Sequence, residues 1–100
     1  NALVVKAPPT CPGAALEMAA LLAEALPEGL VSAVNAPGAA LGEALVCHPG
    51  VDLVSFTGGV STGRAVMASA ARTLKPVVLE LGGNDPAILA PDVAITDALV

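Results

Sequence analysis

Short apolar runs rich in β-formers alternate along this chain with longer segments of helical periodicity, and proline or glycine stands at the junctions. The expected strands cover residues 3–5, 30–34, 51–56 and 77–81. The expected helices run from residue 11 or 12 to 25, from 40 to 47 and from 61 to 74, and the chain's last residues, 99 and 100, also have helical character. This alternation predicts right-handed crossovers and a doubly wound parallel α/β sheet covered by helices.

Ligands of such folds bind beyond the carboxyl ends of the strands. Three stretches of the chain follow predicted strands and therefore deserve scrutiny: Lys6 to Pro12, Asn35 to Gly42 and Thr57 to Gly63. In the third, glycines allow a sharp turn, and the helix that follows offers unpaired N–H groups to a phosphate. The spacing matches neither of the two common phosphate-binding fingerprints, so a plain tight turn is the alternative.

Two charged residues occupy strand ends. Glu80 lies in an apolar run directly before two glycines, where a buried carboxylate would need a partner or a catalytic role such as general acid or base. The alternative is a carboxylate that faces water. Lys6 follows the first strand, where its ammonium could reach a ribose hydroxyl or a phosphate, and the alternative is a solvated surface lysine.

Composition excludes several classes of protein. The chain has 100 residues, one aromatic residue and four Lys and Arg against nine Asp and Glu, so a nucleic-acid partner is not expected. No run approaches the roughly 20 apolar residues that span a bilayer, and no signal peptide is visible, so the expected location is the cytoplasm and no membrane partner is expected. Two cysteines in different contexts predict neither a disulfide nor a metal site.

Three motifs resemble those of aldehyde dehydrogenases in order and approximate spacing. They are Lys6 within Val-Lys-Ala-Pro-Pro, Phe56-Thr57-Gly58-Gly59 with Gly63, and Glu80-Leu81-Gly82-Gly83. The resemblance spans nearly the whole chain. It implies that residues 1–100 are part of the Rossmann-like nucleotide-binding domain of a larger enzyme, whose catalytic-cysteine domain lies outside this chain.

The resemblance also implies a reaction and its residues. In that family a cysteine thiolate attacks an aldehyde, hydride passes to NAD or NADP, and a glutamate, here Glu80, acts as general base in hydrolysis of the thioester to a carboxylic acid. The cofactor-binding residues implied by the resemblance are Lys6, Gly38, Gly42, Thr57, Gly58, Gly59, Gly63 and Leu81. The resemblance further implies that the whole enzyme is a homodimer or homotetramer.

Departures from the family pattern leave some features open. Pro9 stands where NAD-preferring relatives often carry a glutamate, so the resemblance implies NAD or NADP without choosing between them. Two alternatives remain: a CoA-acylating relative, against which the retained Glu80 argues, and a non-catalytic nucleotide-binding or structural homologue. As a piece of a larger protein, without the nucleophilic cysteine, the chain is expected to be inactive alone and to be marginally stable or to aggregate.

Overall fold

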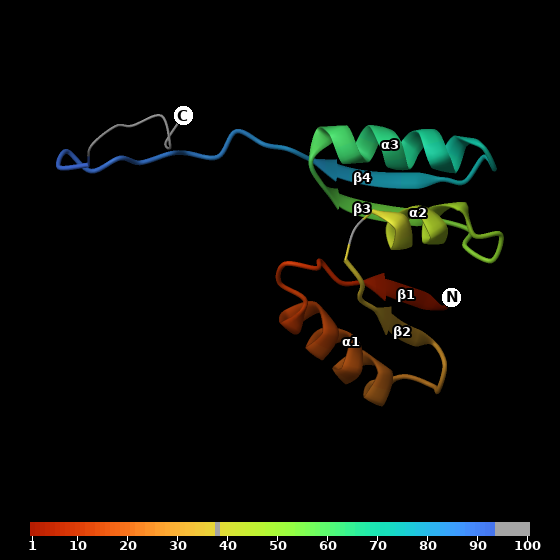
Figure 1. Ribbon diagram of the computed structural model, residues 1–100. Coiled ribbons are helices and arrows are strands. Elements are labelled where there is room, and N and C mark those ends of the chain that lie inside the picture. Colours follow the sequence, from red (N-terminus) through yellow and green to blue (C-terminus); the bar gives the residue numbers. More distant parts are fainter. Residues whose placement is uncertain (38, 94–100) are drawn as a thin grey trace.

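The structure of the chain is a computed structural model, and it describes residues 1–37 and 39–93. Strands and helices alternate along it (Figure 1). The elements are β1 (Leu3–Lys6), α1 (Gly13–Ala25), β2 (Val31–Val34), α2 (Ala40–Cys47), β3 (Val54–Gly58), α3 (Val60–Ala71) and β4 (Val77–Leu81). The predicted helix at residues 99 and 100 lies outside the described residues.

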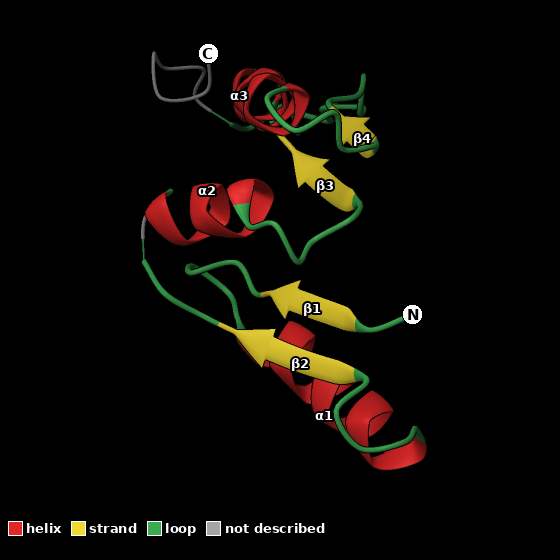
Figure 2. Cartoon of the chain, turned by 90° about the vertical axis from the view of Figure 1, so that its right-hand side faces the viewer, coloured by secondary structure: helices red, strands yellow, loops and turns green. Residues whose placement is uncertain are grey.

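All strand pairing in the described part of the chain is parallel, which confirms the predicted α/β class. β1 pairs with β2, and β3 pairs with β4, so the strands form two separate two-stranded sheets. α1 packs on the first pair and α3 on the second, while α2 packs against α3 (Figure 2). The elements thus form two β-α-β units, a first unit of β1, α1 and β2 and a second unit of β3, α3 and β4. Because α2 packs against α3, the connection after β2 leads from the first unit to the second.

The third strand begins later than the sequence predicts. Residues 51–53 are not part of it, because the Val51 N–H group turns back to donate to the His48 carbonyl oxygen. Pairing starts at Val54, whose N–H group donates to Pro76, and it continues to Gly58. Thr57 and Gly58, expected in a turn, are therefore the last two residues of β3.

The third helix ends earlier than expected, at Ala71 rather than Leu74. Its last turn tightens, and Leu74 takes a left-handed backbone conformation with φ of 55°. A residue in this conformation closes the helix because the carbonyl groups of the last turn find their partners in the residues that follow.

The buried core is made of small side chains. Its members are Ala7, Ala19, Val46 and Ala70. Small residues let a helix approach a sheet closely. Many larger apolar side chains stay exposed, including Met18 and Leu21 on α1, so the two β-α-β units leave broad apolar faces uncovered.

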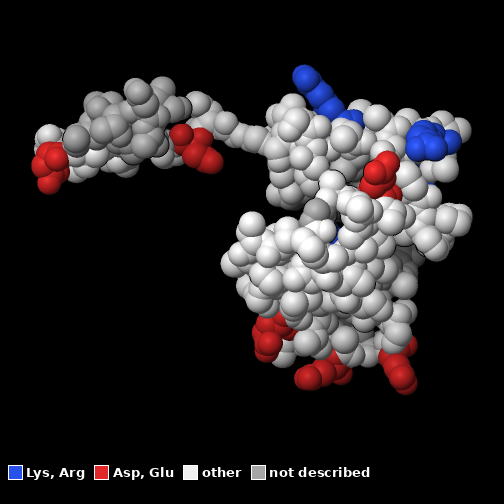
Figure 3. All heavy atoms as spheres, viewed as in Figure 1, with Lys and Arg blue, Asp and Glu red and all other residues white. Residues whose placement is uncertain are grey.

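Figure 3 shows basic side chains over α3, and acidic ones over α1 and along the segment after β4. Beyond β4 the chain continues as an exposed segment without helix or strand to residue 93, and it leads away from both sheets (Figure 1). Within residues 1–37 and 39–93, no helix combines the length and apolar character that crossing a membrane requires.

Candidate functional site

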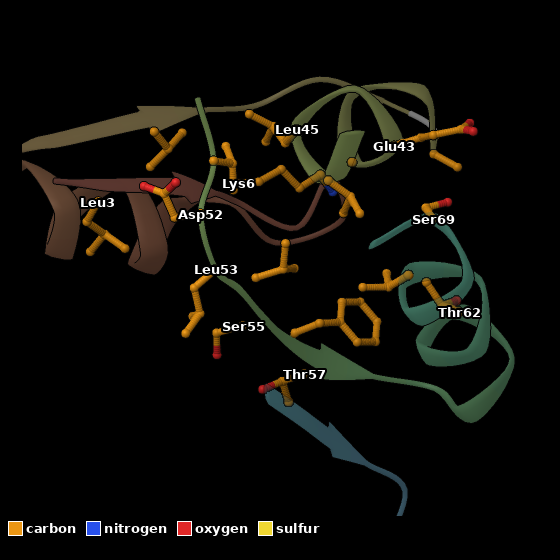
Figure 4. A pocket seen from close by; sticks show the side chains of 18 of the residues that line it. Leu3, Lys6, Glu43, Leu45, Asp52, Leu53, Ser55, Thr57, Thr62 and Ser69 are labelled. Carbon is orange, nitrogen blue, oxygen red and sulfur yellow. The ribbon is translucent and has the colours of Figure 1, made fainter. Parts of the chain in front are cut away.

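A cavity of about 1150 Å³ lies between the two β-α-β units. β1 and the loop after it form one wall, and α2, β3, the segment before β3 and one face of α3 from Thr62 to Ser69 form the others (Figure 4). Three of the predicted cofactor-binding residues line it: Lys6, Gly42 and Thr57. The fold therefore brings together residues from each of the three stretches that follow predicted strands.

Lys6 is the last residue of β1 and is half-buried. It pairs in register with Val34, and the next residue, Ala7, is fully buried and donates its N–H group to the Val34 carbonyl oxygen at 3.0 Å. This anchoring fixes the backbone at the point where the lysine leaves the strand. Its side chain runs toward α2 (Figure 4), and the residue lines the cavity.

Gly42 lies in the first turns of α2 and is half-buried on the cavity wall. A Cβ atom at this position would meet no neighbouring atom within 4 Å. The glycine is therefore not required by packing within the described residues, and its missing side chain leaves room on the cavity side. Gly38, the other glycine predicted here, lies outside the described residues.

The β3–α3 junction is as short as a strand-to-helix turn can be, because Gly59 alone separates Gly58 from Val60. Gly59 is extended, with φ of −71° and ψ of 151°, and its carbonyl accepts the first helical hydrogen bond, from Gly63, at 2.9 Å. In the described residues no side chain caps this end of α3. Its first N–H groups therefore remain available to an anion, and Thr62 of the first turn lines the cavity.

Two glycines of this junction are required by close packing. A Cβ on Gly58 would lie 2.6 Å from the ring of Phe56, and one on Gly63 would lie 2.5 Å from a methyl group of Leu81. Gly63 is buried, and its contact with Leu81 seats α3 on β4. The predicted site residues Gly58, Gly63 and Leu81 therefore shape the junction, and none of them lines the cavity.

Glu80 is exposed, so of the two alternatives that the sequence left open the described residues show the carboxylate that faces water. β4 alternates between half-buried and exposed positions, and α3 covers only the face that carries Leu79 and Leu81. Glu80 lies on the other face, in register with Thr57, which is exposed on the same face of β3. The strand register thus places the carboxylate beside a residue of the cavity wall.

Sequence reasoning gave no role to several polar residues of the cavity wall, among them Glu43 and Thr62. Their one signal was position, because Glu43 follows Gly42 and Thr62 precedes Gly63. Cys11 is exposed and Cys47 half-buried, and both carry free thiols. Among the described residues, no three His, Cys, Asp or Glu side chains gather as a metal site would require.

The model of the aldehyde dehydrogenase family matches residues 1–100. The chain belongs to the aldehyde dehydrogenase family. Aldehyde dehydrogenase LUC3 from a Fusarium species is 38% identical over 96 residues, which are 96% of this chain and 21% of that protein. The resemblance to this family that the sequence predicted is thus confirmed.

Solved structures show the same fold. An NAD-dependent aldehyde dehydrogenase from Sinorhizobium meliloti is 40% identical with a TM-score of 0.79, over 85% of this chain and 17% of that one. An NADP-dependent enzyme from Escherichia coli is 38% identical with a TM-score of 0.77, over 83% of this chain and 18% of that one. The chain thus spans about a fifth of the length of these relatives.

Proposed function

We propose that the protein containing this chain oxidises an aldehyde to a carboxylic acid with NAD or NADP, and that residues 1–100 form part of its nucleotide-binding domain. The observation that carries the proposal is the cavity in which Lys6, α2 and the first turn of α3 meet, next to the registered pair Thr57 and Glu80. Family membership and the cofactors named for the two solved relatives support it.

The residues present fit a dinucleotide. The cavity's volume, about 1150 Å³, exceeds that of the usual pocket for a drug-sized ligand, about 300–1000 Å³. Lys6 supplies a cation for ribose or phosphate oxygens, and the uncapped end of α3 supplies N–H groups for a phosphate. Gly42 leaves room on the α2 wall. The bound cofactor supplies the hydride acceptor.

Glu80 serves as the general base of this proposal. The carboxylate takes a proton from a water molecule as the water oxygen attacks the carbonyl carbon of a cysteine thioester. The carbon–sulfur bond breaks, the carboxylic acid leaves and the sulfur departs as thiolate. The exposed position of Glu80 gives it access to water, and its register with Thr57 holds it near the cavity. The nucleophilic cysteine belongs to the part of the enzyme outside this chain.

The test is an assay of the full-length protein with a panel of aliphatic and aromatic aldehydes, each with NAD⁺ and with NADP⁺. We expect aldehyde-dependent formation of reduced nicotinamide and release of the free acid, at equal amounts. Reduction that depends on added CoA, with an acyl-CoA product, would instead identify a CoA-acylating enzyme. Cofactor binding without turnover of any aldehyde would identify a non-catalytic homologue.

We also propose that the enzyme is a homodimer or a homotetramer and that it is located in the cytoplasm. Light scattering after size-exclusion chromatography measures the assembly directly. A monomer at micromolar concentration would contradict that part of the proposal and leave the reaction unaffected.

A further inference from the structure

Lys75 reaches from the turn between α3 and β4 to the end of α2. Its ammonium donates a hydrogen bond to the Val46 carbonyl oxygen at 2.8 Å and a second one to the carbonyl oxygen of His48. The residue is half-buried, and the two acceptors lie 29 and 27 positions away in sequence. Among the described residues, no other side-chain hydrogen bond joins separate helices or strands.

The chemistry at the end of α2 suits a cation. The last carbonyl groups of a helix have no partner within it, and they carry the negative end of the helix dipole. Lys75 satisfies two carbonyl groups of this end at once. Beyond them, the His48 Nδ1 atom accepts the Gly50 N–H group at 3.0 Å, so the turn that presents the second carbonyl is itself closed.

The turn that carries Lys75 is closed by two backbone hydrogen bonds. The N–H group of Leu74 donates to Ala71 at 3.2 Å, and that of Lys75 donates to Ala70 at 3.1 Å, which is the double hydrogen bond of a Schellman motif. Glycine usually occupies the left-handed position of this motif, but here Leu74 does, with φ of 55°. The chain thus tolerates an unfavourable backbone at the one place that sets the direction of Lys75.

α2 is a wall of the cavity, since Gly42 and Glu43 both line it, and Lys6 extends toward this helix from the opposite side (Figure 4). An anchored end of α2 therefore fixes the position of this helix on α3, and with it one wall of the cavity. We propose that Lys75 is a positioning residue that holds α2 at the correct distance for the dinucleotide, and so sets cofactor affinity without touching the cofactor. The inference rests on the proposed function of the cavity.

The experiment replaces Lys75 in the full-length protein. Lys75→Met keeps the apolar stem and removes the ammonium. We expect the dissociation constant for the preferred nicotinamide cofactor, measured by calorimetry, to rise about five-fold to ten-fold, because the bonds of a charged donor are lost. The KM for the cofactor should rise with it, while kcat at saturation and the KM for the aldehyde change less than about two-fold.

Two variants make the result specific. Arg72→Met removes an exposed cation three residues away and should leave cofactor affinity unchanged. Lys75→Arg keeps a charged donor and should recover most of the lost affinity; it also carries the test if the methionine variant does not fold, by showing a smaller rise. A purely structural role would lower Tm and leave the cofactor dissociation constant unchanged.

The outcomes separate the two proposals. A wild-type protein that binds neither NAD⁺ nor NADP⁺ would overturn both the proposed function and this inference. If the wild-type protein binds cofactor and both Lys75→Met and Lys75→Arg bind it with the wild-type dissociation constant, the inference alone is overturned. A fall in kcat with unchanged cofactor affinity would also contradict it.

Discussion

The two β-α-β units differ in how closely the helix packs on its strands. In the first, six residues separate β1 from α1, and α1 buries only Ala19 while several of its larger apolar side chains stay exposed. In the second, one residue separates β3 from α3, and α3 buries both Gly63 and Ala70. Two glycines of the second unit also fit against neighbouring side chains with no space for a Cβ atom.

The difference shows where each unit carries its specificity. The first unit contributes Lys6 to the cavity wall from a strand end, and several of its larger apolar side chains are exposed. The second unit uses close packing to aim a helix N-terminus and to set Glu80 beside Thr57. Substitutions of the same type should therefore have different effects in the two units.

The largest difference should come from adding bulk to a helical glycine in each unit. Gly63→Val drives two methyl groups into Leu81 and should lower the free energy of unfolding by about 2–3 kcal/mol. Gly13→Val, at the start of α1 with nothing within 4 Å, should change it by less than about 0.5 kcal/mol. Urea unfolding of the full-length protein measures both. Equal effects would show that the two units are packed alike.

A smaller effect is expected at the glycine on the cavity wall. Gly42→Ala meets open space, so it should stabilise α2 by about 0.5 kcal/mol, because alanine favours a helix more than glycine does. The same methyl group would intrude on a ligand in the cleft, so cofactor affinity should fall while Tm rises slightly. Calorimetric titration and thermal melting on one sample measure the pair. If cofactor affinity and Tm both rise, the cofactor does not lie against α2.

A third comparison concerns the two turns that lead from a helix into the next strand. Leu74 and Gly29 both have positive φ, of 55° and 83°. Leu74→Gly should therefore raise stability, and Gly29→Ala should lower it, each by about 1 kcal/mol. Shifts in Tm of the two variants give the comparison. A loss of stability in Leu74→Gly would mean that the leucine side chain, although 89% exposed here, packs on another part of the enzyme.

The sequence alone predicted the order and parallel class of the elements, because the periodicity alternates and breakers such as Pro8, Pro37 and Pro49 stand between elements. It predicted the start of β3 poorly, because a local turn at Val51 competed successfully with the β propensity of the run. The sequence did not predict that the strands form two separate pairs. This division goes with the packing of α2 against α3 and not against the first unit, and such a long-range contact has no local signal in the sequence.

The candidate site was predictable to different degrees. Lys6 and Thr57 follow from their places at strand ends, and both line the cavity. The exposure of Glu80 did not follow, because an apolar run does not reveal which face of its strand lacks a covering helix. Lys75 was missed altogether, since a hydrogen bond to a carbonyl 29 residues away leaves no pattern in the sequence.

The most direct test of the account is the kinetics of Glu80→Gln in the full-length enzyme, followed from the first turnover. We predict a burst of reduced cofactor close to one per active site, followed by a steady-state rate at least about 100-fold below that of the wild type, because the thioester forms but its hydrolysis lacks a base. An unchanged steady-state rate would contradict the central claim that Glu80 is the general base of this enzyme.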